Sequence, residues 1–263
     1  MPFYINDPDE NLATYAKRSK KGRLRKSKAK TKKQAKKNEI IDIPFSKYKS
    51  KGTRATLGDV YFHYQKYSNI NNFFSILNKD FKNKINLNRQ RLTINARKNK
   101  LTLDNIHELD CSASLNLLII DLDTTEGKHA NIAIINNINN TIEYYEPHGY
   151  RKNKNSEIAD IKGIYNKKNK LLKDYFKKIL PNHSFIDVVS MNKKTSFQAL
   201  LDPDENTGFC VTWCILFAHY RLLNPNILLS RLIKHIDKTI NTTKLLKYAK
   251  HVEDTIKHKF DLK

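Results

Sequence analysis

The chain has 263 residues, with 49 Lys and Arg against 26 Asp and Glu, which gives a formal net charge of +23. This length can hold one full domain and an accessory region, with a core large enough for a rigid site. The three cysteines form neither a CxxC pair nor a zinc quartet, which argues against a disulfide scaffold and indicates a reducing compartment. Because no apolar run reaches the roughly 18 residues of a membrane span and residues 1–15 lack a signal-peptide core, we expect a soluble, intracellular protein.

Residues 1–38 are expected to form a basic, disordered arm. The stretch from Lys17 to Lys37 contains 13 basic residues and no acidic ones, and it has no apolar periodicity with which to build a core. A solvated tail, a nuclear-import signal and a nucleic-acid-binding arm all fit this composition, since Lys and Arg bind phosphates without reading sequence. The third interpretation predicts DNA contacts by Lys17, Arg18, Lys20, Lys21, Arg23, Arg25, Lys26, Lys28, Lys30, Lys32 and Lys33.

Residues 39–110 are expected to form a mostly helical accessory region. Residues 39–45 are a short apolar segment that can dock the end of the arm onto the body of the protein. Phe73, Phe74, Leu77 and Phe81 recur at helical spacing within an aromatic cluster. A stripe of this kind is more typical of a buried core than of a surface that stacks nucleic-acid bases.

Residues 111–263 are expected to form a single α+β domain that carries the candidate catalytic residues. Three short β-rich runs at 115–122, 131–136 and 141–145 are separated by turn signals and predict an antiparallel meander. Helical spacing or apolar runs then predict the remaining elements. These are a helix over 167–180, strands over 184–190 and 195–201, and helices over 207–223, 224–235 and 242–260.

Cys210 lies in the first turn of the predicted helix after Gly208. The helix dipole and the unpaired N–H groups there favour a thiolate over a thiol, and a thiolate is a nucleophile. The alternative is that Cys210 and Cys214, four residues apart, are two small apolar side chains on one buried helix face.

Two further residues supply what cysteine catalysis requires. His129 stands at the start of one predicted strand and Glu146 at the end of the next. Because these strands are adjacent and antiparallel, Glu146 can hold one ring nitrogen of His129 while the other faces the thiol. Gln198, twelve residues before Cys210, can form an oxyanion hole together with the Cys210 backbone N–H. Each residue by itself is typical of an ordinary surface position, but the order histidine, acid, glutamine and helix-start cysteine favours a catalytic site.

The segments 128–131, 145–149 and 208–213 resemble the ubiquitin-like-protein proteases and their viral relatives. The similarity covers about residues 115–235 and is strongest toward the adenovirus endoprotease and the capsid or polyprotein maturation proteases of large DNA viruses. It implies a papain-like α+β fold with a mostly antiparallel sheet, Cys210 as nucleophile, His129 as base, Glu146 as orienting acid and Gln198 in the oxyanion hole. Some relatives use Asp or Asn as third member, so a neighbour of Glu146 is an alternative.

The resemblance implies a cysteine endopeptidase that cleaves viral structural or polyprotein precursors after small residues such as Gly. It implies neither a metal nor a cofactor, although DNA could serve as activator or track through the arm. Protein substrates in the virion and the host cytoplasm are expected, with a nuclear location as an alternative. The other functional readings are a ubiquitin-type isopeptidase, an acyltransferase on the same scaffold, or an inactive basic DNA-binding virion protein.

Overall fold

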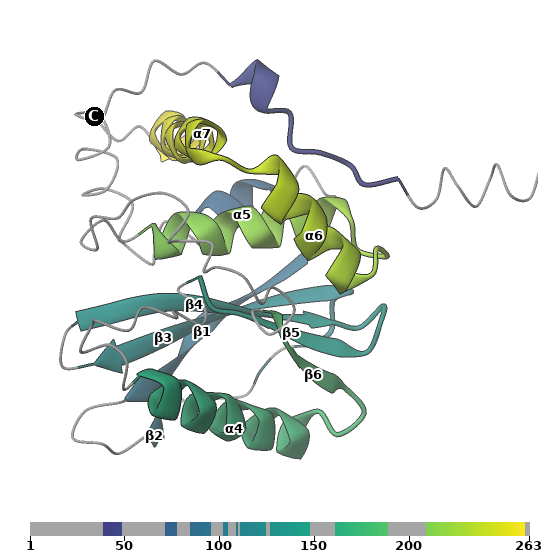
Figure 1. The fold of residues 1–263 in the computed structure, drawn as a ribbon, viewed down its shortest axis with the longest axis vertical. Helices are drawn as coiled ribbons and strands as arrows, with labels where there is room; N and C mark the ends of the chain where they lie inside the picture. The colour runs from purple at the N-terminus through teal and green to yellow at the C-terminus, as the bar shows by residue number, and fades with distance from the viewer. Residues whose placement is uncertain are drawn as a thin grey trace, which may run out of the picture. The chain divides into compact units, whose positions relative to one another are not determined.

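The computed structural model describes residues 39–48, 72–77, 85–95, 102–104, 109, 111–124, 127–147, 161–188 and 209–260. The chain divides into two units, Met1–Ile40 and Ile41–Lys263, and every element described below belongs to the second. The expected basic arm at residues 1–38 lies outside the described residues, as does the strand expected over 195–201. The α+β class is confirmed, because a mixed sheet lies between helices on its two faces (Figure 1).

The meander predicted in the middle of the sequence is the centre of the sheet. Strands β3 (Leu115–Thr124), β4 (Gly127–Asn136) and β5 (Thr141–Tyr145) follow one another as antiparallel neighbours. The apolar run of β3 is typical of a strand that is buried on both faces. In the turn between β4 and β5, Asn140 has φ of 51°, a left-handed conformation that asparagine tolerates better than most residues.

Three more strands extend the meander at its two edges. β1 (Ile85–Asn95) pairs in parallel with β3 and β2 (Thr102–Asp104) pairs with β1, so the strand order is β2-β1-β3-β4-β5-β6. β6 (Ser184–Asp187) pairs in parallel with β5 and is partly exposed, whereas a buried strand was expected over 184–190. The described part of that stretch is therefore an edge strand.

The region 39–110 differs from the expected mostly helical accessory region. Its described residues include a short helix at 72–77, but β1 and β2 are strands of the same sheet as β3. The alternation of apolar Leu92 and Ile94 with polar neighbours is a strand pattern, and both side chains are buried in the sheet core. The described part of this region therefore contributes to the central sheet. The domain boundaries at 38 and 110 stay a prediction.

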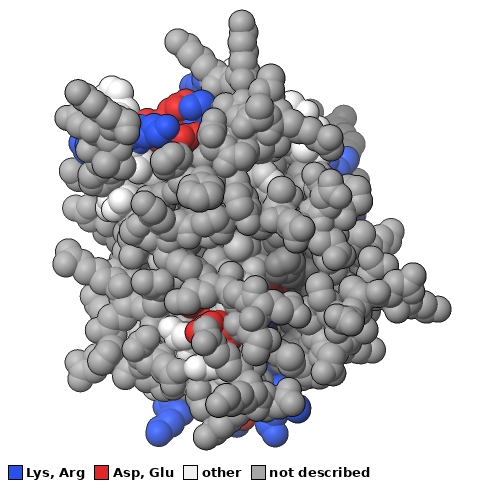
Figure 2. All heavy atoms as spheres, turned by 90° about the vertical axis from the view of Figure 1, so that its left-hand side faces the viewer, with Lys and Arg blue, Asp and Glu red and all other residues white. Residues whose placement is uncertain are grey.

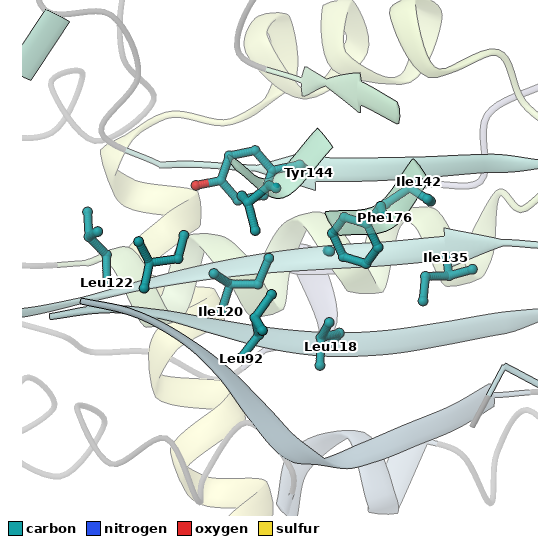
Figure 3. Packing of buried hydrophobic residues seen from close by; sticks show 11 residues of the cluster. Leu92, Leu118, Ile120, Leu122, Ile135, Ile142, Tyr144 and Phe176 are labelled. Atoms are coloured by element: carbon teal, nitrogen blue, oxygen red, sulfur yellow. The ribbon is translucent and has the colours of Figure 1, made fainter. Parts of the chain in front are cut away.

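One face of the sheet is covered by α4 (Ile161–Ile179), which Figure 1 places opposite the other helices. Leu172 and Phe176 of α4 are buried against the strands in the cluster shown in Figure 3. The strand residues of this cluster are Leu92, Ile94, Leu118, Ile120, Leu122, Ala133, Ile135, Ile142 and Tyr144. The exposed side of α4 is rich in lysine, and basic side chains stand out in Figure 2 at the level of this helix.

The opposite face is covered by α5 (Cys210–Leu223), and α6 (Leu229–Thr239) and α7 (Thr242–Phe260) lie beyond it (Figure 1). α5 is buried along nearly its whole length, as the predicted central helix requires, and Phe217 stacks on Tyr145 of β5 with ring centroids 4.5 Å apart. None of the helices in the described ranges is long and apolar enough to cross a membrane.

The segment at 41–48 docks onto these helices, as expected for the apolar residues before 45. Ile43 and Phe45 are buried, and η1 (Phe45–Lys47) is a single 3-10 turn. The backbone of Ile41 exchanges two hydrogen bonds with the Asn224 side chain, at 2.7 and 2.9 Å. This pairing fixes the point at which the described body of the protein begins.

Candidate active site

The β4–β5 hairpin brings His129 and Glu146 together, as the antiparallel meander predicted. Ile132 pairs with Tyr145, so Glu146 lies one residue past the ladder, next to the start of β4. The Nε2 atom of His129 forms a short ion-paired hydrogen bond with Oε1 of Glu146. The two side chains are 13% and 3% exposed. The carboxylate is therefore buried, while the imidazole retains limited access to solvent.

Cys210, which was predicted to lie in the first turn of a helix, is the first residue of α5. The N-cap residue, Phe209, offers no side-chain acceptor, and the first helical backbone bond runs from the Trp213 N–H to the Phe209 carbonyl at 2.9 Å. Because no side chain caps the helix, the unpaired N–H groups of the first turn and the positive end of the helix dipole are available to the groups at the helix start. Cys210 is 4% exposed. Water therefore screens little of the electrostatic field that the helix start exerts on its sulfur.

Cys210 and His129 form a side-chain hydrogen bond, and each shifts the pKa of the other. Burial acts to lower the pKa of His129, but the charges of Glu146 and Cys210 and hydrogen bonds to both raise it to about 9. Burial likewise acts to raise the pKa of the Cys210 thiol, but the charge and hydrogen bond of His129 bring it below its ordinary value. Both shifts act in the direction that favours a thiolate beside an imidazolium.

The backbone of Ala130 distinguishes the two cysteines of α5. A backbone hydrogen bond from Ala130 helps to lower the pKa of Cys210. The Cys214 thiol instead donates to the Ala130 carbonyl at 3.5 Å, and burial together with the charges of Cys210 and Glu146 raises its pKa well above the ordinary value. Cys214 is therefore held as a neutral thiol one turn behind Cys210.

Glu146 is held by two further side chains. Lys168 of α4 donates to Oε2 at 2.5 Å, and both of these side chains are buried. The amide of Asn131, in the orientation that turns its nitrogen toward Glu146, donates to Oε2 at 2.5 Å and to the Tyr144 hydroxyl at 3.3 Å. Both carboxylate oxygens are thus engaged, which fixes the carboxylate plane and leaves Oε1 directed at His129.

Three of the four predicted catalytic residues therefore meet, in the order Cys210, His129, Glu146. Gln198 lies outside the described residues, and so do the basic residues predicted to bind DNA, from Lys17 to Lys33. The sequence interpretation missed Asn131 and Lys168. Asn131 shares a strand side with His129 because it is two residues away, and Lys168 lies one turn before Leu172 on the buried side of its helix. The two-residue spacing from His129 and the one-turn spacing from Leu172 can both be read in the sequence.

This arrangement brings together a thiol, an imidazole and a carboxylate, the three groups that nucleophilic cysteine catalysis uses. Because Nε2 of His129 is used by Glu146, the hydrogen bond with the Cys210 sulfur falls to the other ring nitrogen, Nδ1. Within the described ranges, no group of three or more His, Cys, Asp or Glu side chains is placed to hold a metal ion. The thiol, imidazole and carboxylate together can move a proton from the thiol to a leaving group.

No protein-family model matches the chain, and no curated protein matches its sequence. Among solved structures it is similar to the 1.7 Å structure of ChlaDub1 from Chlamydia trachomatis, with 11% identity and a TM-score of 0.34 over 56% of this chain and 61% of that one. The effector protein ChlaDUB1 of the same organism gives 11% identity and a TM-score of 0.36 over 59% of this chain and 64% of that one. The C. trachomatis effector Cdu1 bound to ubiquitin gives 11% and 0.36 over 61% and 72%. The chain thus spans less than two thirds of the first two proteins.

Proposed function

We propose that this protein is a cysteine peptidase that hydrolyses peptide bonds through Cys210, His129 and Glu146. The observation that carries the proposal is the hydrogen-bonded series from the Cys210 sulfur through the His129 ring to the Glu146 carboxylate, at the start of a buried helix. A lone buried cysteine would show a raised pKa, as Cys214 does. The opposite shift at Cys210 supports a nucleophilic role.

Acylation begins when the Cys210 thiolate attacks the carbonyl carbon of the scissile bond. A C–S bond forms and the carbonyl oxygen becomes an oxyanion, which backbone N–H groups at the start of α5 can stabilise together with Gln198. The His129 imidazolium then gives its proton to the amide nitrogen, so the C–N bond breaks and a neutral amine leaves. The product is a thioester on Cys210 beside a neutral imidazole.

Deacylation repeats these steps with water. The neutral His129 ring removes a proton from water as the water oxygen attacks the thioester carbon. The C–S bond breaks and releases the acid product, and the Cys210 thiolate is restored next to an imidazolium. Glu146 supports both stages because its carboxylate orients the ring and balances the positive charge whenever it forms.

The substrate class rests on the family resemblance of the segments around His129, Glu146 and Cys210. That resemblance suggests cleavage after small residues such as Gly in viral structural or polyprotein precursors. The proposed location in virions and host cytoplasm has the same basis, whereas a DNA-binding role for residues 17–37 rests on their 13 basic residues and lack of acidic ones. A truncated protein that lacks residues 1–38 should lose DNA affinity and its dependence on salt concentration, and unchanged binding would remove the DNA proposal.

Two cysteine variants test the peptidase proposal directly. Cys210→Ala should abolish cleavage of a Gly-Gly peptide substrate, whereas Cys214→Ala, a matched control one helical turn away, should retain it. Equal activity of the two variants would refute the assignment of the nucleophile. A ubiquitin-like activity-based probe, tested beside the peptide, separates an endopeptidase from an isopeptidase: labelling by the probe with no peptide cleavage favours the isopeptidase.

A further inference from the structure

Lys168 occupies a position on α4 that would normally hold an apolar residue. It precedes Leu172 and Phe176 by one and two turns, and all three side chains are buried. Lysine is almost never fully buried unless it is paired, because its ammonium loses strong hydration. At 2% exposure, Lys168 therefore needs a partner that offsets this loss.

The partner is the carboxylate of the candidate triad. The Lys168 Nζ lies 2.5 Å from Oε2 of Glu146 and 5.5 Å from the centroid of the Tyr144 ring. The other carboxylate oxygen, Oε1, is engaged by His129. Figure 1 shows α4, which carries Lys168, and α5, which begins at Cys210, on opposite sides of the sheet.

Charges of alternating sign therefore run through the centre: thiolate, imidazolium, carboxylate and ammonium. Other titratable groups near Glu146 come from the strands and from α5. Among the described residues, the titratable groups that contact Glu146 or interact with its charge include His129 of β4, Tyr144 and Tyr145 of β5, Cys210 and Cys214 of α5, and Lys168 of α4.

The acyl-enzyme stage shows why the ammonium matters. Once Cys210 carries an acyl group and His129 has released its proton, neither holds a charge. Without Lys168, Glu146 would then be a carboxylate at 3% exposure with hydrogen-bond donors but no neighbouring positive charge, which is an unfavourable state for a buried ion. With Lys168 beside it, the carboxylate stays paired, ionised and directed at the ring that must next take a proton from water.

We propose that Lys168 is a positioning residue of the candidate triad, whose ammonium keeps Glu146 charged and turned toward His129 while the imidazole is neutral. This inference rests on the proposed function and names a further residue of the same site. A purely structural role, in which Lys168 only fastens α4 to the sheet, predicts lost stability without a change in the chemistry of Cys210.

The first test compares Lys168→Met with Lys170→Met, a matched control on the exposed side of α4. Removing one positive charge makes the neighbouring groups hold their protons more tightly. The pH dependence of Cys210 alkylation by iodoacetamide should move up by about one pH unit in Lys168→Met and stay in place in the control. A lowered melting temperature with an unmoved pH dependence would overturn the proposal in favour of the structural role.

The second test isolates deacylation with an aryl ester of a Gly-Gly dipeptide, whose leaving group needs little help from an acid. In Lys168→Met, the steady-state rate should fall at least about tenfold while the burst of released phenol persists, because the acyl-enzyme accumulates. Lys168→Arg restores the charge and should recover most of the rate. A charge-retaining variant as slow as Lys168→Met would contradict a charge-based role.

A double variant covers the case in which Lys168→Met does not fold. Glu146→Gln/Lys168→Met removes both charges and leaves no unpaired ion. If Lys168 acts through Glu146, this protein should show the same alkylation pH dependence as Glu146→Gln alone. A further shift in the double variant would show that Lys168 acts by another route and would overturn the proposal.

Failure of the proposed function gives a different result from failure of this inference. If Cys210 is not a catalytic nucleophile, wild-type protein shows no burst with the ester and the Cys210 alkylation profile is that of an ordinary thiol. If only the inference fails, the wild type shows both signatures and Lys168→Met leaves the pH dependence unchanged.

Discussion

Glu143 lies in the middle of β5 and Glu146 just past its end, and both are almost completely buried, yet their partners differ. Glu143 on β5 is paired through Oε2 with Nε of Arg221 on α5 at 2.7 Å, and those side chains are 1% and 0% exposed. Glu146 is paired with His129 and with Lys168. Both carboxylates are matched by a cation, so neither is an isolated buried ion.

The difference lies in whether the partner can release a proton. A guanidinium stays protonated at any ordinary pH, and Arg221 is further held by the carbonyls of Asn224 and Ile227 at 3.0 and 2.7 Å. The Arg221 pair can therefore only fasten α5 to β5. An imidazole changes charge within the working range of pH, so the Glu146 pair can support proton transfer. Burial of an ion pair is thus no sign of catalysis unless one member titrates.

The largest effect should come from replacing His129, the member of the His129–Glu146 pair that can gain and lose a proton. His129→Gln removes the proton carrier, and hydrolysis of a Gly-Gly peptide should fall by about 10²–10⁴-fold with little change in the urea midpoint. His183→Gln is the matched control, because His183 Nε2 donates one bond to Asn137 Oδ1 at 2.9 Å beside the β4–β5 turn, away from the site. Similar rates in the two variants would contradict the role of His129.

The next largest effect is on stability, from the pair that cannot titrate. Arg221→Met leaves Glu143 buried without its cation and should lower the free energy of unfolding by about 3–5 kcal/mol, measured by urea denaturation. The double variant Arg221→Met/Glu143→Gln removes both charges and should recover part of this loss. A cost below about 1 kcal/mol for Arg221→Met would show that the pair does not hold α5 on the sheet.

A smaller effect is expected on the pH dependence of cysteine alkylation and of peptide hydrolysis. Because the pKa of Cys210 is lowered, its alkylation by iodoacetamide should decline less steeply from pH 8 to pH 6 than that of Cys111. Comparing each cysteine with its own rate at pH 8 cancels differences in access. Hydrolysis should fall above pH 9, where His129, whose pKa is raised to about 9, loses its proton. Parallel profiles for the two cysteines would contradict the ion pair.

The smallest effect is expected at a carboxylate that is not buried. Asp42 is 51% exposed and accepts hydrogen bonds from Tyr220 Oη at 2.9 Å and His235 Nε2 at 2.8 Å. Water and salt screen such a pair, so Asp42→Asn should cost no more than about 1 kcal/mol in urea denaturation, and less at high salt. A loss of unfolding free energy above about 2 kcal/mol would show that Asp42 stabilises the fold as strongly as a buried carboxylate such as Glu143.

Much of the fold follows from local pattern. The apolar runs around Ile119, Ile134 and Tyr144 predicted the meander, the first turn of α5 was predicted to contain Cys210, and the start of α7 at Thr242 was predicted to the residue. β1 was missed because aromatic residues upstream suggested helix, and its strand character depends on pairing with β3. Sequence spacing predicted the meeting of His129 and Glu146, since neighbouring antiparallel strands make it local.

The sequence alone determined where the strands of the meander and the helices α4, α5 and α7 form, because periodicity and helix-start signals act over a few residues. Only the tertiary structure decided which distant side chains share a buried charge. Lys168 reaches Glu146, and Arg221 reaches Glu143, across 22 and 78 positions of sequence. Such pairings depend on how helices pack on the two faces of the sheet, where burial makes each unpaired charge costly and so selects its partner.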